Sequence, residues 1–566
     1  MGEGGAEVVG AAMRRWGVLG AAVCAGGMAW GQSAPLTFWV GFGAKSWGAD
    51  YPYRLERPED FLSDRALERR ATDGIALDSL DLPVAPALLA TLEDLPGVRV
   101  LHASKWLNAA SVAVEDSTFD PAVLEAVPGV VEVRRMATGG GRRPEPEAPG
   151  GRGGAVVPPD TGRYGAGWVP LVQLNGATLH AHGYRGEGVQ IAVLDAGFER
   201  ADVLPCFETA RATGRLNAGW DVAGSQGGLY AHHRHGTMVL GTMAAFWPDS
   251  LIGTAPDATY FLYRTENAAT EYLLEEDQWA VAAEHADSAG VDILTTSLGY
   301  TTFDDSTMNH TPADLDGATA RISRATAVAA TRGLLVVNSA GNTGNTEWHF
   351  ISAPADADGI LAVGAVNAAG DHAPFSGFGP TADGRVKPDV MAHGWQAAYP
   401  THDTLVKYGN GTSFSAPILA GMAACLMQAV PQASAQEIRE AIIASAHLAD
   451  APNDSMGYGI PDFRRAWELL EKVPPAAETG SIRLFPNPGD GLVRWSAGWA
   501  PTRWEAWTVQ GRRVAEGPVP VWAGAAGGTG GWIDLRGMGL AAGAYVLKFS
   551  SPDAAATATY LLSPPQ

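Results

Sequence analysis

Short apolar runs alternate with longer segments of helical periodicity between residues 164 and 472. The strand-like runs are Val189–Leu194, Thr259–Tyr263, Val291–Thr295, Leu334–Asn338 and Ile360–Val366. Glu275–Ala289 and Gly317–Thr331 have the apolar spacing of helices. Strands that alternate with helices predict a parallel sheet covered on both faces, an α/β doubly wound fold. In such sheets the functional groups gather at the carboxyl ends of the strands.

The regions on either side of this α/β part have other patterns. Before it, a charged helical stretch lies among short strand-like runs, which predicts a small α+β domain; the segments are Thr37–Phe42, Pro58–Ala71, Val98–Ala103 and Ala110–Val114. After it, brief strands are separated by turns rich in Gly and Pro, which predicts a small β-sandwich. These strands are Ser481–Phe485, Leu492–Ser496, Ala544–Ser550 and Thr557–Leu562.

The start of the chain has the order of an export signal. Arg14 and Arg15 precede the apolar run Trp16–Ala29, and small or polar residues follow. The expected parts are a signal peptide 1–33, an α+β domain 34–136, a linker 137–163, the α/β domain 164–472, a linker 473–480 and a β-sandwich 481–566. The linker 137–163 is rich in Gly, Pro and Arg, and its arginines are natural sites for proteolytic cleavage.

Composition narrows the function. The 566 residues are 46% hydrophobic and 18% charged, as in a folded protein, and the formal net charge is −22. Nucleic acid is disfavoured as a partner, because phosphate binding needs a basic surface. The three cysteines, Cys24, Cys206 and Cys425, do not form a disulfide framework. We expect the last two to be small buried side chains, with a single bridge between them as the alternative.

Three motifs of the α/β part carry candidate chemistry. The apolar run Ile191–Leu194 ends in Asp195, His235 opens the string His-Gly-Thr, and Ser413 lies in Gly-Thr-Ser-Phe-Ser-Ala-Pro before an apolar helical run. A serine hydroxyl is a weak nucleophile that needs a base within hydrogen-bond reach and a third group to orient the base. Asp, His and Ser in this chain order match one known arrangement of the triad. Ser413 is expected to begin a helix, whose amino end favours developing negative charge.

A fourth segment, Leu335–Asn342, is a strand that ends in a turn with an amide side chain. Asn342 could donate a hydrogen bond to the oxyanion of a tetrahedral intermediate, alongside the backbone N–H of Ser413. Each residue alone has an ordinary explanation: Asp195 could end a strand, His235 could belong to a loop, and Asn342 could hold a turn. The four together, in this order, favour catalysis.

On these motifs the α/β part resembles the subtilase family of serine endopeptidases, peptidase S8. The resemblance implies that Asp195 orients the base, His235 is the general base and acid, Ser413 is the nucleophile that forms an acyl-enzyme, and Asn342 supports the oxyanion. It also implies polypeptide substrates and no cofactor for catalysis.

Three further features bear on this resemblance. Ser297, Leu298 and Gly299 resemble the family's strand that pairs with the substrate backbone. Gly253-Thr254-Ala255-Pro256 also matches a family segment. Ala196 departs from the family, which commonly has Thr or Ser there. We expect this difference to change the hydrogen bonding around the triad without abolishing activity.

Two other functions share parts of this pattern. The related sedolisins share a Gly-Thr-Ser-x-Ser string but use Glu and Asp in place of His, and the intact motif at His235 argues against them. The alternative from another class is an inactive subtilase-fold protein that binds at the cell surface. All four catalytic positions are filled, which argues against that alternative.

The flanking parts resemble those of exported subtilases. Phe61–Arg70 and Ser104–Asn108 resemble the propeptide of such enzymes from Bacteroidetes-like bacteria. This implies a zymogen in which domain 34–136 is an intramolecular inhibitor. Leu484–Pro488 and Gly543–Leu547 resemble a type IX secretion sorting domain, although a basic residue often found in its final strand is missing near Thr559–Leu562. That resemblance implies the secretion machinery as a partner and a secreted or cell-surface location.

No metal site is assigned from the sequence. His232, His233 and His235 lie close together, but the first two cannot readily face the same ion as the third, and no Cys or Glu is spaced to help. We therefore expect a polar loop beside His235. Calcium is common in the family, but the chain has no D-x-D-x-D-G loop, so the sequence neither predicts nor excludes a structural calcium site.

Overall fold

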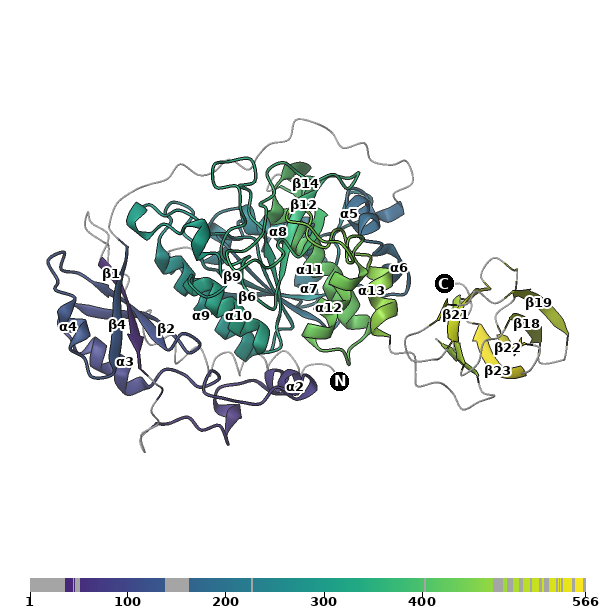
Figure 1. Ribbon diagram of the computed structural model, residues 1–566, viewed down its shortest axis with the longest axis horizontal. Coiled ribbons are helices and arrows are strands. Elements are labelled where there is room, and N and C mark those ends of the chain that lie inside the picture. The colour runs from purple at the N-terminus through teal and green to yellow at the C-terminus, as the bar shows by residue number, and fades with distance from the viewer. Residues whose placement is uncertain are drawn as a thin grey trace. The chain divides into compact units, whose positions relative to one another are not determined.

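The structure is a computed structural model, and its described chain divides into two compact units, residues 1–470 and 471–566 (Figure 1). It describes residues 36–43, 45, 51–137, 162–224, 228–401, 404–471, 482–485, 492–497, 502–508, 512–518, 522–523, 529–535, 538, 540, 543–551 and 555–562. The predicted signal peptide, the linker 473–480, and the linker 137–163 apart from residues 137, 162 and 163 lie outside the described residues.

A four-stranded antiparallel sheet, in the order β2-β3-β1-β4, organises residues 36–137. The elements of this N-terminal domain are β1 Leu36–Phe42, η1 Pro58–Asp60, α2 Asp64–Thr72, α3 Pro86–Glu93, β2 Val98–Ser104, β3 Ala109–Val114, α4 Ala122–Glu125 and β4 Val130–Ala137. Phe38, Val40 and Val112 of the sheet share a core with Leu92 of α3 and Leu124 of α4. The predicted α+β domain is confirmed, and β4 extends one residue past the expected boundary at 136.

The expected single helix Pro58–Ala71 is wrong in detail. A short 3-10 turn, η1, ends at Asp60, and α2 begins only at Asp64. Ser63 caps this second helix, because its Oγ accepts a hydrogen bond from the Ala66 N–H at 3.2 Å. A serine at this position favours a helix start over helix continuation.

A seven-stranded parallel sheet, in the order β13-β12-β11-β10-β5-β9-β6, forms the centre of the α/β domain. Its strands are β5 Gln190–Asp195, β6 Leu216–Asp221, β9 Thr259–Arg264, β10 Ile293–Thr296, β11 Leu335–Ser339, β12 Leu361–Val366 and β13 Val390–His393. Its helices are α5 Trp168–Gln173, α6 Ala177–Ala181, α7 Glu208–Ala212, α8 His235–Ala244, α9 Leu273–Ala289, α10 Arg321–Thr331, α11 Thr412–Ala429, α12 Ala435–Ser445 and α13 Phe463–Leu470. The hairpin β14 Trp395–Pro400 and β15 Val406–Asn410 precedes α11, and β7 Phe246–Trp247 pairs with β8 Leu251–Ile252.

Alternate residues of the strands face two different cores. Ile191 and Val193 of β5 belong to the core that also holds α8 and α11. Ala192 and Leu194 belong to the core that holds α9 and α10. Helices therefore cover both faces of the sheet, and the predicted doubly wound fold is confirmed (Figure 1). Among the described helices, only α11 is long and apolar enough to cross a membrane, and its apolar length is mostly buried between the sheet and other helices.

The strand order reverses its direction at the middle of the sheet. β9 and β6 lie on one side of β5, and β10 to β13 lie on the other. Ligands bind at the carboxyl ends of the strands where the order reverses in this way. The candidate site is therefore expected beyond the ends of β5 and β10.

The two described cysteines confirm the expectation of buried thiols. Cys206 and Cys425 are both buried and free. Burial raises the pKa of the Cys206 thiol to about 12. The alternative of a bridge between them is wrong.

The C-terminal unit consists of two four-stranded antiparallel sheets, β16-β17-β21-β20 and β19-β18-β22-β23. The strands are β16 Ile482–Phe485, β17 Leu492–Ala497, β18 Arg503–Thr508, β19 Arg513–Pro518, β20 Trp522–Ala523, β21 Thr529–Asp534, β22 Gly543–Ser550 and β23 Ala555–Leu562. This agrees with the predicted β-sandwich. The residues Pro486, Asn487 and Pro488, in the segment that resembles a sorting domain, lie outside the described residues.

Candidate active site

Three of the predicted site segments lie at one edge of the sheet. Asp195 ends β5, Ser297 follows β10, and Asn342 comes shortly after β11. These strands are neighbours in the order β11-β10-β5, and they are parallel. The fold therefore gathers residues that are up to 147 positions apart in the sequence.

Asp195 and His235 form a hydrogen-bonded pair. The Asp195 side chain is fully buried, and His235 Nδ1 lies 2.8 Å from its Oδ1 and 3.0 Å from its Oδ2. His235 begins α8 and has a side chain that is 24% exposed. The imidazole thus has one nitrogen held by the carboxylate, which fixes the ring orientation and leaves Nε2 for chemistry.

The glycine after His235 is required by close packing. The Gly236 N–H donates to the Gly197 carbonyl at 3.0 Å, and a Cβ on Gly236 would lie only 2.4 Å from that oxygen. The Ala196 N–H donates to Asp195 Oδ1 at 2.8 Å, whereas its methyl side chain can donate nothing. The departure at Ala196 thus leaves the backbone bond to the carboxylate in place.

Asp195 also sets the titration of His235. Burial lowers the pKa of His235, but the charge of Asp195 and the hydrogen bond to it act in the other direction and prevail. The pKa of His235 therefore lies above its usual value of 6.5.

Ser413 lies in the first turn of α11 and is half-buried. Its Oγ donates to the Ser297 carbonyl at 3.4 Å, and Ser297 Oγ donates to the Ser413 carbonyl at 2.9 Å. In this ground state none of the hydrogen bonds found among the described residues joins Ser413 to His235. Such a bond is often long without substrate and tightens in the reacting complex.

The amide of Asn342 has a defined orientation. Its Oδ1 accepts hydrogen bonds from the Thr412 N–H at 2.9 Å and from Thr412 Oγ1 at 3.0 Å. The amide nitrogen is therefore the free end, and it faces Gly411, beside Ser413. Thr412 was not among the predicted site residues, although it lies inside the motif Gly-Thr-Ser.

Comparison with known families decides the identity of this region. The model described as "Subtilase family" matches residues 186–459, and the model "Peptidase S8 propeptide domain, Bacteroidota" matches residues 37–147. Residues 186–459 are a subtilase domain. Residues 37–147 are accordingly its propeptide domain, and the chain is of the subtilisin-like serine protease type.

Several curated proteins are similar to this subtilase. Subtilisin DY of Bacillus licheniformis is 27% identical over 49% of this chain and 90% of its own length. The subtilisin-like protease SBT6.1 of Arabidopsis thaliana is 27% identical over 55% of this chain, but the match spans only 28% of the plant protein. Among solved structures, that of the MycP3 protease from the type VII (ESX-3) secretion system aligns with a TM-score of 0.43 and 22% identity over 59% of this chain and 93% of that one.

The segment Ser297–Gly299 continues from β10 beyond the strand pairing of the subtilase sheet. Ser297 is buried, Leu298 is half-buried and Gly299 is exposed. The next residue, Tyr300, forms an isolated antiparallel bridge with Ala353. The buried end of this segment lies next to Ser413, because the side chains of Ser297 and Ser413 each donate to the other residue's carbonyl oxygen.

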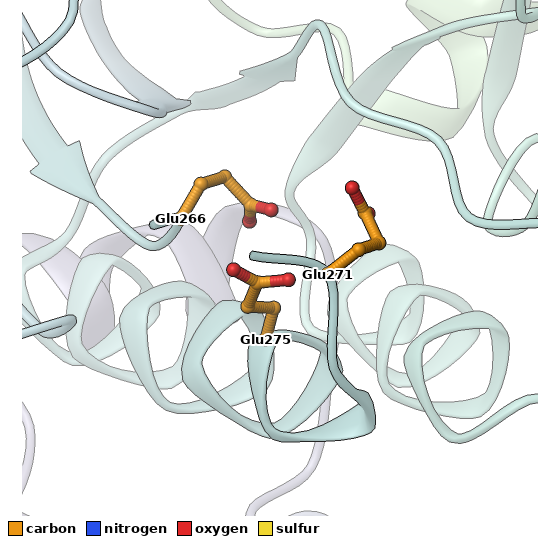
Figure 2. Close-up of side chains that lie close together, drawn as sticks. All are labelled: Glu266, Glu271 and Glu275. Atoms are coloured by element: carbon orange, nitrogen blue, oxygen red, sulfur yellow. The ribbon is translucent and has the colours of Figure 1, made fainter. Parts of the chain in front are cut away.

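Three glutamates that were not predicted as site residues form an acidic cluster near this segment. Carboxylate oxygens of Glu266, Glu271 and Glu275 all lie within 4.8 Å of one another, and Figure 2 shows the carboxylates of Glu266 and Glu275 facing each other with Glu271 beside them. Tyr300 Oη donates to Glu266 at 2.5 Å, which connects the cluster to Ser297–Gly299. The three residues match no known metal-binding motif, so their closeness within ten positions was the one sequence feature that could have indicated the cluster.

The glutamates repel one another. Burial raises the pKa of Glu266 to about 8, with the charge of Glu271 and a smaller effect of Asp195 in the same direction. Burial and the charge of Glu266 raise the pKa of Glu275 well above its usual value. Carboxylates held this close are the oxygen ligands that a hard cation such as Ca²⁺ prefers. Within the described part of the chain, this is the only group of three or more such ligands at this spacing; His232, His233 and His235 do not form one.

Proposed function

We propose that the chain is an exported serine endopeptidase in which Asp195, His235 and Ser413 form the catalytic triad. The observation that carries the proposal is the hydrogen bond from His235 Nδ1 to the buried Asp195 carboxylate, at the sheet edge where α11 presents Ser413. The subtilase match over residues 186–459 supports the same reaction.

In the proposed reaction Ser413 Oγ attacks the peptide carbonyl carbon, and its proton moves to His235 Nε2. The tetrahedral oxyanion accepts hydrogen bonds from the Ser413 N–H and the Asn342 side-chain amide. His235 then gives its proton to the leaving amine as the acyl-enzyme forms. Water attacks the acyl-enzyme by the same route and releases Ser413. Asp195 stabilises the imidazolium in both steps.

The substrate is proposed to be an extended polypeptide. Ser297, Leu298 and Gly299 are placed to pair with its backbone by strand addition, which aligns the scissile carbonyl with Ser413. The reaction itself needs no cofactor. The cluster of Glu266, Glu271 and Glu275 is the candidate for a structural calcium.

The experiment that tests this mechanism is the kinetic comparison of Asn342→Ala with the wild type. We expect kcat to fall by about 10²–10³ with KM little changed, because the amide donates mainly to the transition state. Asn345→Ala, an exposed asparagine three residues later, is the matched control and should change neither constant. A raised KM with unchanged kcat for Asn342→Ala would contradict the oxyanion role.

The domain 34–136 is proposed to be an intramolecular inhibitor that is removed after folding. A parallel sheet forms from contacts distant in sequence and folds slowly, so a domain docked on it can stabilise its late-forming structure. The docked strand β4 ends at Ala137, at the start of the linker. Arg321 of α10 contacts Met136 of this strand, so the last residues of β4 lie against the subtilase domain.

The C-terminal unit is proposed to be a sorting domain that places the enzyme outside the cell or on its surface. Deleting residues 481–566 should leave an active protease that stays inside the cell, because this unit is separate from residues 1–470. Cell fractionation with a peptidase assay measures the outcome, and the full chain is the control. Normal export of the truncated chain would exclude the sorting role, and loss of folding would make the unit part of the catalytic core.

A further inference from the structure

The propeptide domain contacts the subtilase domain at the edge of the sheet opposite the candidate active site. Arg65 of α2 donates to the carbonyl oxygens of Gly188 and Gly290, both at 3.0 Å and just before β5 and β10. Arg69 donates to the Arg332 carbonyl at 3.3 Å, just before β11. Strands rise about 3.3 Å per residue, so the six residues of β5 and the five of β11 put this contact roughly 17–20 Å from the active-site edge. Figure 1 shows α2 apart from the β1–β4 sheet.

Asp287 of α9 is the centre of a buried ion cluster at this contact. Its side chain is fully buried, and within the described chain every cation that pairs with it comes from the propeptide domain: Arg69, Arg70 and Lys105. Arg70 Nη2 lies 2.9 Å from both carboxylate oxygens. Burial raises the pKa of Asp287, but the three cations lower it by more, so the carboxylate stays charged.

In a second set of ion pairs the subtilase domain supplies the cation and the propeptide domain supplies the carboxylates. The buried guanidinium of Arg332, in the subtilase domain, lies 3.1 Å from Asp78 and 3.4 Å from Asp81 of the propeptide domain. Arg70 bridges the two sets, because it also contacts Asp81 at 2.9 Å. Removing one member of such a cluster leaves a buried charge without its partner, which strongly weakens the association.

This contact region has its own small hydrophobic core. Tyr51, Phe61, Leu62, Ala66 and Leu82 pack together, separate from the core under the β1–β4 sheet. The region around α2 is therefore a structured module and not an extension of strand β4.

We propose that the segment Phe61–Leu82, the anchor segment, is a second attachment site that holds the propeptide domain on the subtilase domain after the linker is cut. Its partner is the surface of the subtilase domain that contains the charged residues Asp287, Asp292 and Arg332. The inference rests on the proposed role of domain 34–136 as an inhibitor. Two contacts joined through one folded domain bind more tightly than either alone, so loss of the contact between β4 and the subtilase domain does not by itself release the propeptide domain.

The test measures how fast the propeptide domain leaves a full chain whose linker has been cut. Every chain carries Ser413→Ala and a recognition site for an added, sequence-specific protease at positions 145–150. Native mass spectrometry then follows the free propeptide domain with time. We expect the wild-type anchor to stay bound and Arg70→Gln to raise the dissociation rate about 10²-fold. Arg57→Gln is the matched control, because this side chain is 67% exposed, and it should leave the rate unchanged.

Equal dissociation rates for Arg70→Gln and the wild-type anchor would overturn the proposal. If Arg70→Gln fails to fold, Arg65→Gln gives the same comparison, because it removes the partly exposed pair with Asp292. The same experiment on a cut chain with an intact Ser413 distinguishes the anchor proposal from the proposed inhibition, because its peptidase activity can also be measured. Peptidase activity while the domains remain together contradicts inhibition and supports the anchor, whereas immediate separation of the domains contradicts the anchor.

Discussion

Replacing Ser413 with alanine is expected to lower kcat by about 10⁶ and to leave KM nearly unchanged. Without the hydroxyl no acyl-enzyme can form, and only substrate binding and the oxyanion donors remain. The fold should persist, because the Oγ of Ser413 makes a single long hydrogen bond of 3.4 Å, to Ser297. Hydrolysis of a fluorogenic peptide measures the loss, and circular dichroism checks the fold.

Ser415→Ala is the matched control for this substitution. Ser415 lies one half-turn further along α11, is fully buried, and has a hydroxyl with no hydrogen-bond partner among the residues that the structure describes. Its removal should change kcat by no more than a few fold. A Ser413→Ala protein that kept more than about one hundredth of the wild-type rate would contradict the assignment of the nucleophile.

Replacing Asp195 with asparagine is expected to lower kcat by about 10⁴ and to move the acid limb of the pH profile. His235 accepts the proton of Ser413 only when neutral, so activity rises with pH through the pKa of His235. Asp195 holds the pKa of His235 above 6.5. In the Asp195→Asn variant the carboxylate charge is gone, so burial lowers the pKa of His235. The acid limb should therefore move to lower pH while the plateau falls.

The profile of kcat/KM against pH measures both effects. Asp202→Asn is the control, because Asp202 is an exposed carboxylate on the loop that follows β5. Its profile should overlay that of the wild type. An acid limb of Asp195→Asn at the wild-type pH, or at higher pH, would show that Asp195 does not control the titration of His235.

The α/β fold could be predicted because its central strands are buried on both faces and read as continuous apolar runs. Two strands of the sheet were not predicted. β6, Leu216–Asp221, is an edge strand with half-exposed residues, and β13, Val390–His393, is only four residues long. Neither has a run of apolar residues long enough to stand out from a loop.

The candidate triad could be predicted because each member lies inside a short local string. The residues that support it could not all be found in this way. Thr412 orients Asn342 through a contact 70 positions apart, and the three glutamates meet only through the fold. The pair of Arg70 and Asp287 spans 217 positions, and no pattern in the sequence marks either residue. Charge complementarity of this kind becomes visible only when the surfaces are in place.

The central claim is that Ser413 is an activated nucleophile, and a fluorophosphonate probe tests it most directly. The processed enzyme is treated with the probe, digested, and mapped by mass spectrometry. The account predicts one adduct, on the peptide that contains Ser413, and none in Ser413→Ala. Absence of labelling in the folded, processed chain, or an adduct on another residue, would contradict it and favour an inactive subtilase-fold protein.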